Sequence, residues 1–180
     1  MAASECTPAA STVEMNQLVL PTHTNALGTV FGGTIMSWID VCAAMSAQRL
    51  CRRVVVTASM DQLDFLAPIR TGQLVNLRAR VNYLGRTSME VGVRVEAEDT
   101  LTGDRVHAAS AYLTFVALDE QGRPTAIDRA LRLTSGDERL RHEEAKERRA
   151  QRLQLAERRR ELARAHAGPD AAAPRSKPAR

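Results

Sequence analysis

The chain has 180 residues, of which 44% are hydrophobic, 26% are charged and only 3% are aromatic. This length suits one domain with a sizeable core plus additional segments. No run of about 18 apolar residues occurs, so no membrane-spanning helix is expected. The first 15 residues also lack the basic and apolar regions of a secretory signal, so we expect a cytoplasmic protein.

The positive charge of the chain is concentrated in its tail. Residues 137–180 contain 13 Lys and Arg against 8 Asp and Glu, whereas the other residues contain 12 against 13. A near-neutral body argues against a nucleic-acid-binding core. We therefore expect no nucleic-acid partner.

The N-terminal third changes from polar segments to a long apolar helix. Residues 1–12 are small and polar, which predicts disorder. Residues 12–20 are expected to form a strand that ends at Pro21. Residues 24–50, "TNALGTVFGGTIMSWIDVCAAMSAQRL", begin as a loop and continue as a helix. Apolar side chains cover nearly all sides of this helix, so it should be buried.

After the helix, the apolar period changes from 3.6 to 2. The β-branched "RRVVVTASMDQLDFLAP" is followed by three alternating segments: "GQLVNLRARVNYLG", "SMEVGVRVEAED" and "RVHAASAYLTFVALD". Alternation indicates antiparallel strands with one packed and one solvated face, and it places Asn82 and Glu90 on the solvated face. The order of strand, helix and four strands predicts an α+β fold in which one curved sheet wraps a central helix. Five strands cannot cover such a helix completely, so a partner subunit is expected.

The end of the chain is charged and favours helix formation. Residues 127–166 are predicted to be a charged, partly helical extension, and residues 167–180 a disordered tail. A weak apolar stripe runs through Leu140, Leu153 and Leu162. The extension is interpreted as a solvated segment or, alternatively, as a basic arm near an anionic ligand or a neighbouring subunit.

The cysteines do not indicate a metal site. Cys6, Cys42 and Cys51 show no metal-ligand spacing. We expect small buried thiols in a reducing compartment and no bound metal.

The glycine pair before the helix is a candidate binding element. Gly32 and Gly33 directly precede the helix, with Thr34 near its start. Unobstructed backbone N–H groups at a helix N-terminus favour a negative charge, such as a phosphate or a developing oxyanion. The loop lacks the lysine of a nucleotide-phosphate loop, so nucleotide hydrolysis is not supported.

Asp40 is a carboxylate about two turns into the apolar helix. Burial disfavours the charged form and should raise the pKa of Asp40 unless a donor or cation compensates. Such a group suits a general base, although an acid hydrogen-bonded within a subunit interface is the alternative. Asn25 offers an amide in the loop that could orient water or polarise a carbonyl, or serve only as a turn residue.

Several blocks in order resemble one known family. The blocks "HTNALGTVFGG", "IDVCAA", "VVVTASMDQLDFLAPIRTG", "LGRTSMEVGVRVEAED" and "AASAYLTFVALDEQGRP" are similar to the acyl-CoA thioesterases of the hotdog fold. Their nearest group is the cytosolic long-chain, brain-type acyl-CoA hydrolases and their bacterial relatives. The resemblance implies a hotdog domain at residues 13–126, with a five-stranded antiparallel sheet around one long helix. It also implies homodimers with active sites at the dimer interface, commonly assembled as hexamers.

The resemblance further implies thioester hydrolysis by a catalytic pair, Asn25 and Asp40, one from each subunit. Asp40 would activate water or, less favoured, attack the carbonyl itself. Backbone N–H groups around Gly32 and Gly33 would stabilise the oxyanion. No metal or organic cofactor is needed, because coenzyme A arrives as part of the substrate.

Other residues are secondary candidates. Thr57 is expected to orient water, or to be a plain strand residue. The turn "GRTS", comprising Gly85, Arg86, Thr87 and Ser88, is implied to contact coenzyme A, with Arg86 as a phosphate partner.

Among the remaining residues, Arg53 is a weaker candidate for coenzyme A contact. His23 is expected to have a structural role beside the loop, and His107 no catalytic role. Met36, Ile39 and Phe65 either line an acyl tunnel or belong to the core.

Two rival functions remain open. A hydroxyacyl-thioester dehydratase on the same fold usually pairs a histidine with an acid, and Asn25 stands where that base would be expected. A non-catalytic acyl-CoA sensor would need a helix-turn-helix segment, for which residues 1–12 are too short.

Overall fold

The computed structural model describes residues 4–166, which form seven strands, two short 3-10 helices and two α-helices. The elements are, in chain order, β1 (Ser4–Cys6), η1 (Pro8–Ser11), β2 (Val13–Leu18), η2 (Pro21–His23), α1 (Gly32–Cys51), β3 (Val54–Phe65), β4 (Leu74–Leu84), β5 (Ser88–Glu98), β6 (Arg105–Leu118), β7 (Arg129–Leu131) and α2 (Gly136–His166).

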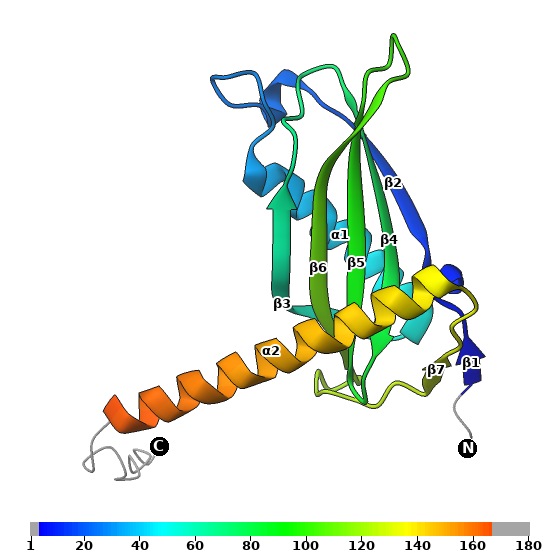
Figure 1. Cartoon of the computed structure of the whole chain (residues 1–180), viewed down its shortest axis with the longest axis vertical. Helices are drawn as coiled ribbons and strands as arrows, with labels where there is room; N and C mark the ends of the chain where they lie inside the picture. The colour runs from blue at the N-terminus through cyan, green and yellow to red at the C-terminus, as the bar shows by residue number, and fades with distance from the viewer. Residues whose placement is uncertain (1–3, 167–180) are drawn as a thin grey trace. The chain divides into compact units, whose positions relative to one another are not determined.

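One antiparallel sheet wraps the first α-helix. Its strand order is β2-β4-β5-β6-β3, and every neighbouring pair is antiparallel. Helix α1 contacts all five strands and lies along one face of the sheet (Figure 1). The predicted order of strand, helix and four strands is confirmed. The predicted hotdog architecture is confirmed with it.

The core lies between α1 and the inward faces of the strands. Alternate residues of β4 and β5 supply most of it, and each is at most 3% exposed: Val75, Leu77, Ala79, Val81, Met89, Val91, Val93 and Val95. The alternation in the sequence therefore identified the packed face correctly. Cys42 and Cys51 are buried in this core and Cys6 is half-buried.

Helix α1 is buried on one side only within the single chain. Ile35, Ile39 and Ala43 face the core, but Met36 and Val41 are 41% and 50% exposed. The prediction of a helix buried all round is therefore not met by one sheet. Among the described residues, no helix is long and apolar enough to cross a membrane.

The N-terminal segment is ordered where the structure describes it. Residues 4–6 pair in parallel with β7, with Ser4 opposite Arg129. In η1, Ser11 is fully buried; its hydroxyl donates to the Pro8 carbonyl (2.7 Å) and accepts from the Val81 N–H (2.9 Å). The expected disorder of residues 1–12 is therefore wrong for residues 4–12, because these contacts hold the segment against the sheet. Residues 1–3 lie outside the described range.

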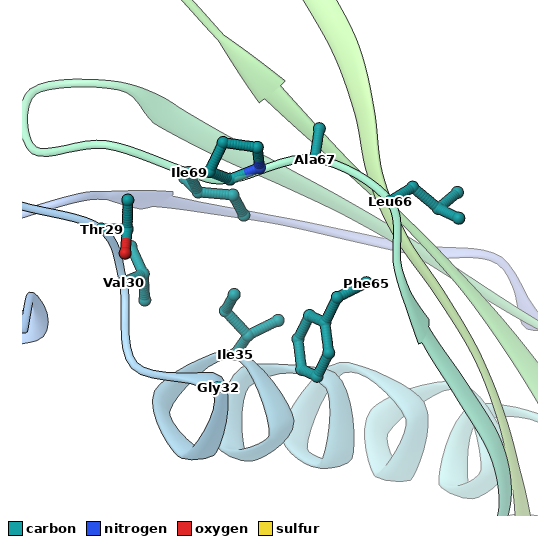
Figure 2. Close-up of a pocket in the computed structure, with 9 residues that line it drawn as sticks. Thr29, Val30, Gly32, Ile35, Phe65, Leu66, Ala67 and Ile69 are labelled. Atoms are coloured by element: carbon teal, nitrogen blue, oxygen red, sulfur yellow. The ribbon is translucent and has the colours of Figure 1, made fainter. Parts of the chain in front are cut away.

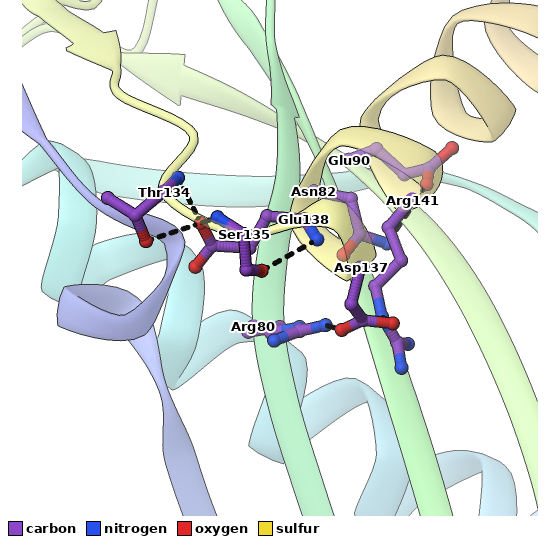
Figure 3. Close-up of polar contacts among 8 residues, drawn as sticks. All are labelled: Arg80, Asn82, Glu90, Thr134, Ser135, Asp137, Glu138 and Arg141. Carbon is purple, nitrogen blue, oxygen red and sulfur yellow. Dashed lines mark hydrogen bonds and ion pairs between the residues drawn. The ribbon is translucent and has the colours of Figure 1, made fainter.

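The outer face of the sheet is partly covered, which corrects a second expectation. Asn82 and Glu90, expected in solvent, are both 3% exposed. A register shift between Val81 and Tyr83 interrupts the alternation of β4. Nδ1 of His142 on α2 lies 3.0 Å from the Asn82 carbonyl oxygen. Figure 3 shows the first turns of α2 beside Asn82 and Glu90, where they cover this part of the face.

The first compact unit of the chain extends into α2. The chain divides into two compact units after Ala145, and β7 and the start of α2 belong to the first unit. In the second unit, residues 146–166 continue the helix with mostly exposed side chains. The predicted disordered tail, residues 167–180, lies outside the described residues.

Helix α2 begins with a reciprocal cap. The Ser135 hydroxyl accepts from the Glu138 N–H (3.1 Å), and a Glu138 carboxylate oxygen accepts from the N–H groups of Thr134 (2.6 Å) and Ser135 (3.2 Å) (Figure 3). Burial raises the pKa of the Glu138 carboxyl. The hydrogen bonds from Thr134 and Ser135 and the charge of Arg80 outweigh burial and hold that pKa below its ordinary value.

Glu138→Ala is expected to lower the free energy of unfolding by about 1–2 kcal/mol at neutral pH, because it leaves buried donors unpaired. The native pKa is below that of the unfolded chain. The stabilisation by Glu138 is therefore complete above its ordinary pKa of 4.5 and is lost as pH falls through the native value. Denaturant unfolding at pH 7 and at about pH 3 checks this. The exposed Glu161→Ala is the matched control; an equal loss at both pH values would contradict the charged cap.

Candidate active site

The central pair of the site is a carboxylate held by a hydroxyl. The Thr57 hydroxyl on β3 donates to Oδ1 of Asp40 on α1 at 2.6 Å. Asp40 is half-buried in the single chain, so the expected full burial is not reached. The other carboxylate oxygen, Oδ2, accepts no hydrogen bond from residues 4–166. This oxygen is therefore available to a water molecule.

A β-bulge follows Thr57 directly. The register of β3 against β6 shifts between Thr57 and Ser59, which leaves one extra residue in β3. Bulges re-aim neighbouring side chains. The hydroxyls of Ser59 and Thr114 both donate to Asp61, and these bonds hold the bulge in place.

The Asn25 side chain organises the loop before α1. Its Oδ1 accepts from the Leu27 N–H (2.9 Å), the Thr29 N–H (3.3 Å) and the Thr29 hydroxyl (3.2 Å). Gly28 takes a positive φ of 71° within this turn. The Asn25 Nδ2 group has no hydrogen-bond partner among the described residues. The amide can therefore donate to a ligand oxygen while its own oxygen fixes the loop.

The start of α1 presents free backbone donors. Helix α1 begins at Gly32, and Phe31 at the N-cap position provides no side-chain cap. Thr34 N–H donates to the Phe31 carbonyl at 3.0 Å. Within residues 4–166, the N–H groups of Gly32 and Gly33 have no acceptor. They are therefore available to a negatively charged oxygen.

His23 anchors the loop, as expected for a structural role. Its Nδ1 accepts a hydrogen bond from the Leu20 N–H (3.2 Å), and its carbonyl accepts one from the Phe31 N–H (3.0 Å). The His23 and Trp38 rings pack edge to face, with their centroids 5.1 Å apart. His107 instead lies beside Arg94 and Ser110 on β5 and β6.

An apolar pocket of about 370 Å³ opens beside the start of α1 (Figure 2). It is lined by Thr29, Val30, Gly32, Ile35 and the segment from Phe65 to Ile69. Of the proposed tunnel residues, Phe65 lines this pocket, whereas Ile39 is wholly buried and Met36 lies elsewhere on α1. Leu66 to Ile69 were not identified from sequence, although the apolar run "FLAPI" at the strand end was the available signal.

The hairpin Gly85–Ser88 lies far from the Asn25 loop. It closes with a bond from the Gly85 N–H to the Ser88 carbonyl (2.7 Å), and the Arg86 side chain is exposed. Phe115 pairs with both Thr57 and Met89, so the hairpin lies near the Thr57 end of β3. Figure 1 shows the hairpin and the Asn25 loop at opposite ends of the sheet.

The donors at the start of α1 are also distant from the carboxylate of the same chain. Asp40 follows Gly32 by about 12 Å along the helix axis, at ~1.5 Å per residue. One reacting carbonyl needs both the base and the oxyanion donors within about 3 Å. The structure therefore brings Asp40 and Thr57 together, but leaves Asn25, Gly32 and Gly33 apart from them.

The described residues do not form an alternative metal or thiol centre. Within residues 4–166, no three His, Cys, Asp or Glu side chains are grouped so that they could hold a metal ion. Burial raises the pKa of the Cys42 thiol to about 11. Cys42 is therefore protonated at neutral pH and a poor nucleophile.

Comparison with known proteins identifies the family. The thioesterase superfamily profile matches residues 27–103. The uncharacterized acyl-CoA thioester hydrolase YkhA of Bacillus subtilis is 48% identical over 121 residues, which cover 67% of this chain and 70% of that protein. The chain belongs to the thioesterase superfamily.

Two further comparisons place this thioesterase within its family. Mouse acyl-coenzyme A thioesterase 11 is 41% identical over 145 residues, which cover 81% of this chain but 24% of that longer protein. A mutant acyl-CoA hydrolase from Staphylococcus aureus is 34% identical with a TM-score of 0.83, covering 89% of this chain and 98% of that one. The thioesterase is thus a thioester hydrolase with the hotdog fold.

Proposed function

We propose that this thioesterase hydrolyses fatty acyl-CoA to a free fatty acid and coenzyme A in the cytoplasm. The observation that carries the proposal is the Asp40 carboxylate, fixed through Oδ1 by Thr57 and open at Oδ2. A carboxylate that is oriented but not neutralised by a cation is suited to take a proton from water.

The chemical step follows from the free groups of the site. Asp40 accepts a proton from water, and the resulting hydroxide attacks the thioester carbon. The carbonyl oxygen becomes an oxyanion that the N–H groups of Gly32 and Gly33 and the Asn25 amide stabilise. The C–S bond then breaks, and the proton held by Asp40 passes to the departing thiolate. Direct attack by Asp40 on the carbonyl is the alternative.

Each site is built from two chains in this proposal. Asp40 and Gly32 of one chain are separated by about 12 Å, which a single carbonyl cannot bridge. The exposed apolar side chains Met36, Val41 and Met45 on α1 suit burial by a second copy. A solved hexameric acyl-CoA thioesterase is 37% identical with a TM-score of 0.81, which supports a homodimer that assembles further into a hexamer.

Other solved structures support the residue assignments. One solved structure is that of the Staphylococcus aureus hydrolase in complex with butyryl coenzyme A, coenzyme A and coenzyme A disulfide. Variants of that enzyme replace an aspartate, an asparagine and a threonine by alanine. The sequence intervals between those three positions equal the intervals between Asp40, Asn25 and Thr57. The hairpin Gly85–Ser88 is assigned to the coenzyme A moiety, and the reaction needs no metal, cofactor or nucleic acid.

Free-thiol release from acyl-CoAs of short to long chain length tests the proposal. Turnover is expected with at least one chain length. Tight binding of acyl-CoA without thiol release would instead favour a sensor. Hydration of an enoyl-CoA without thiol release would favour the dehydratase.

The proposal also assigns an orienting role to Thr57. Thr57→Val keeps the shape of the side chain but removes the hydrogen bond to Asp40, and kcat is expected to fall about tenfold. Thr57→Ser retains the hydroxyl and is the matched control, with kcat within about threefold of wild type. Equal losses in both variants would assign Thr57 a packing role instead.

A further inference from the structure

A basic pocket of about 410 Å³ lies where α1 ends and β3 begins. Three of its lining residues are arginines and only one is acidic; the set is Ser4, Cys51, Arg52, Arg53, Asp128 and Arg129. None of these residues belongs to the Asp40 centre.

The positive charges of this pocket are incompletely neutralised. Arg53 meets Asp128 at 3.3 Å, but that carboxylate is 79% exposed and the pair is therefore weak. Arg129 donates to the uncharged Ser4 hydroxyl. The Arg52 side chain has no partner within the described part of the chain. The pocket thus carries an excess of guanidinium charge with donors free for an anion.

The charges of two of the arginines act on the same side chain, Cys51. Burial raises the pKa of the Cys51 thiol, and the charges of Arg53 and Arg129 oppose that increase. Cys51, Arg53 and Arg129 all line this pocket.

The backbone of Arg52 is a second independent observation. Arg52 ends α1 with a φ of 55° and a ψ of 35°, the left-handed conformation that glycine adopts at lower cost. An arginine at this position is less favourable for folding than glycine. Non-glycine residues in the left-handed conformation cluster at active sites and ligand-binding segments.

The pocket lies at the end of the sheet where coenzyme A is assigned. The Ile127 N–H donates to the Arg86 carbonyl at 2.8 Å, which ties the segment carrying Asp128 and Arg129 to the Gly85–Ser88 hairpin. Arg53 lies directly before β3 and precedes Thr57 by about 13 Å along the chain, at ~3.3 Å per residue. Figure 1 shows the end of α1, the hairpin and the β1–β7 pair at the same end of the molecule.

We infer that Arg52, Arg53 and Arg129 form a binding site for the phosphate groups of the coenzyme A moiety, next to the Gly85–Ser88 hairpin. This inference rests on the proposed function. Guanidinium groups bind phosphate oxygens through paired, charge-assisted hydrogen bonds. The long pantetheine arm between the phosphates and the thioester accounts for a phosphate site that is remote from Asp40.

The test compares two substrates that share a thioester but differ in phosphate. Arg53→Gln combined with Arg129→Gln is expected to raise KM for the acyl-CoA at least about tenfold with little change in kcat. KM and kcat for the matching acyl-N-acetylcysteamine thioester, which has no phosphate, are expected to stay at wild-type values. Arg105→Gln, a surface arginine paired with Glu98 near the other end of β5, is the control.

A second variant separates binding from folding. Arg52→Gly relieves the left-handed backbone, so the unfolding temperature is expected to be at least that of wild type while KM for acyl-CoA rises several-fold. Acyl-dephospho-CoA, which lacks the 3′-phosphate, identifies the phosphate involved. If the arginine substitutions still raise KM for this substrate, the arginines bind the diphosphate. If they no longer raise it, the arginines bind the 3′-phosphate.

The outcomes also separate this inference from the proposed function. Unchanged KM for acyl-CoA in both variants, or an equal rise for both substrates, would overturn the phosphate site while hydrolysis by the wild type stands. Absence of hydrolysis by the wild type with every substrate would instead overturn the proposed function.

Discussion

Replacing Asp40 by asparagine is expected to lower kcat for acyl-CoA hydrolysis by about a hundredfold or more, with KM little changed. Asparagine has the shape of aspartate, and its amide oxygen still accepts the hydrogen bond from Thr57. It cannot take a proton from water at neutral pH. The loss therefore reports the proton transfer and not the packing of α1.

The measurement is free-thiol release by wild type and variant at saturating acyl-CoA. Asp104→Asn is the matched control, because Asp104 is an exposed aspartate that accepts from the Thr102 hydroxyl in the turn after β5. A loss of less than about tenfold in Asp40→Asn would remove Asp40 from the role of base.

The same site allows base and nucleophile to be distinguished. In a single turnover in water labelled with heavy oxygen, a water molecule activated by Asp40 places the label in the fatty acid. Direct attack by Asp40, followed by hydrolysis at the aspartyl carbon, places the label in the protein instead. An unlabelled fatty acid in the first turnover would identify Asp40 as the nucleophile.

Hybrid oligomers of two inactive variants are expected to recover activity. Asn25→Ala and Asp40→Ala each disable every site of a homodimer. A mixed dimer combines the intact Asn25 of one chain with the intact Asp40 of the other and regains one of its two sites. Purified mixed dimers are therefore expected to show about half of wild-type activity.

The measurement is thiol release by co-expressed chains that carry different affinity tags and are purified through both. Each variant mixed only with itself is the control and should stay inactive. A purified hybrid with no activity would show that Asn25 and Asp40 of the same chain serve one site, contrary to the separation of about 12 Å along α1.

Local sequence patterns determined much of the fold. The alternation of Val75 to Val81 and of Met89 to Val95 identified the inward faces of two strands, because side chains of a strand point alternately to its two faces. The apolar stretch after Gly32 and Gly33 identified the one long helix of the core. The family resemblance added the identity of the fold and the candidate pair Asn25 and Asp40.

The outer face of the sheet could not be predicted in the same way. Asn82 and Glu90 are polar and occupy positions that alternate with the core, so they were assigned to solvent. They are buried where the first turns of α2 pack against this face, and His142 of α2, which is 60 residues further along the chain than Asn82, contacts the Asn82 carbonyl oxygen. No local pattern near Asn82 contains that contact.

The ordered N-terminus has the same kind of cause. Residues 4–11 are small and polar, so their composition alone predicts disorder. Their order depends on the pairing of Ser4 with Arg129 and on the hydrogen bond between Ser11 and Val81, each formed with a distant part of the chain.

By itself, the sequence determined which faces of the strands are packed, and its family resemblance supplied candidate side chains for thioester hydrolysis. Only the tertiary structure decided that Thr57 holds Asp40, that Gly32 and Gly33 keep free donors, and that Arg52, Arg53 and Arg129 share one pocket. The physical reason is the distance along the sequence over which each feature is set. Side-chain periodicity is a property of neighbouring residues, whereas these groupings depend on strand register, a β-bulge and the end of a helix, which the packing of the whole domain sets.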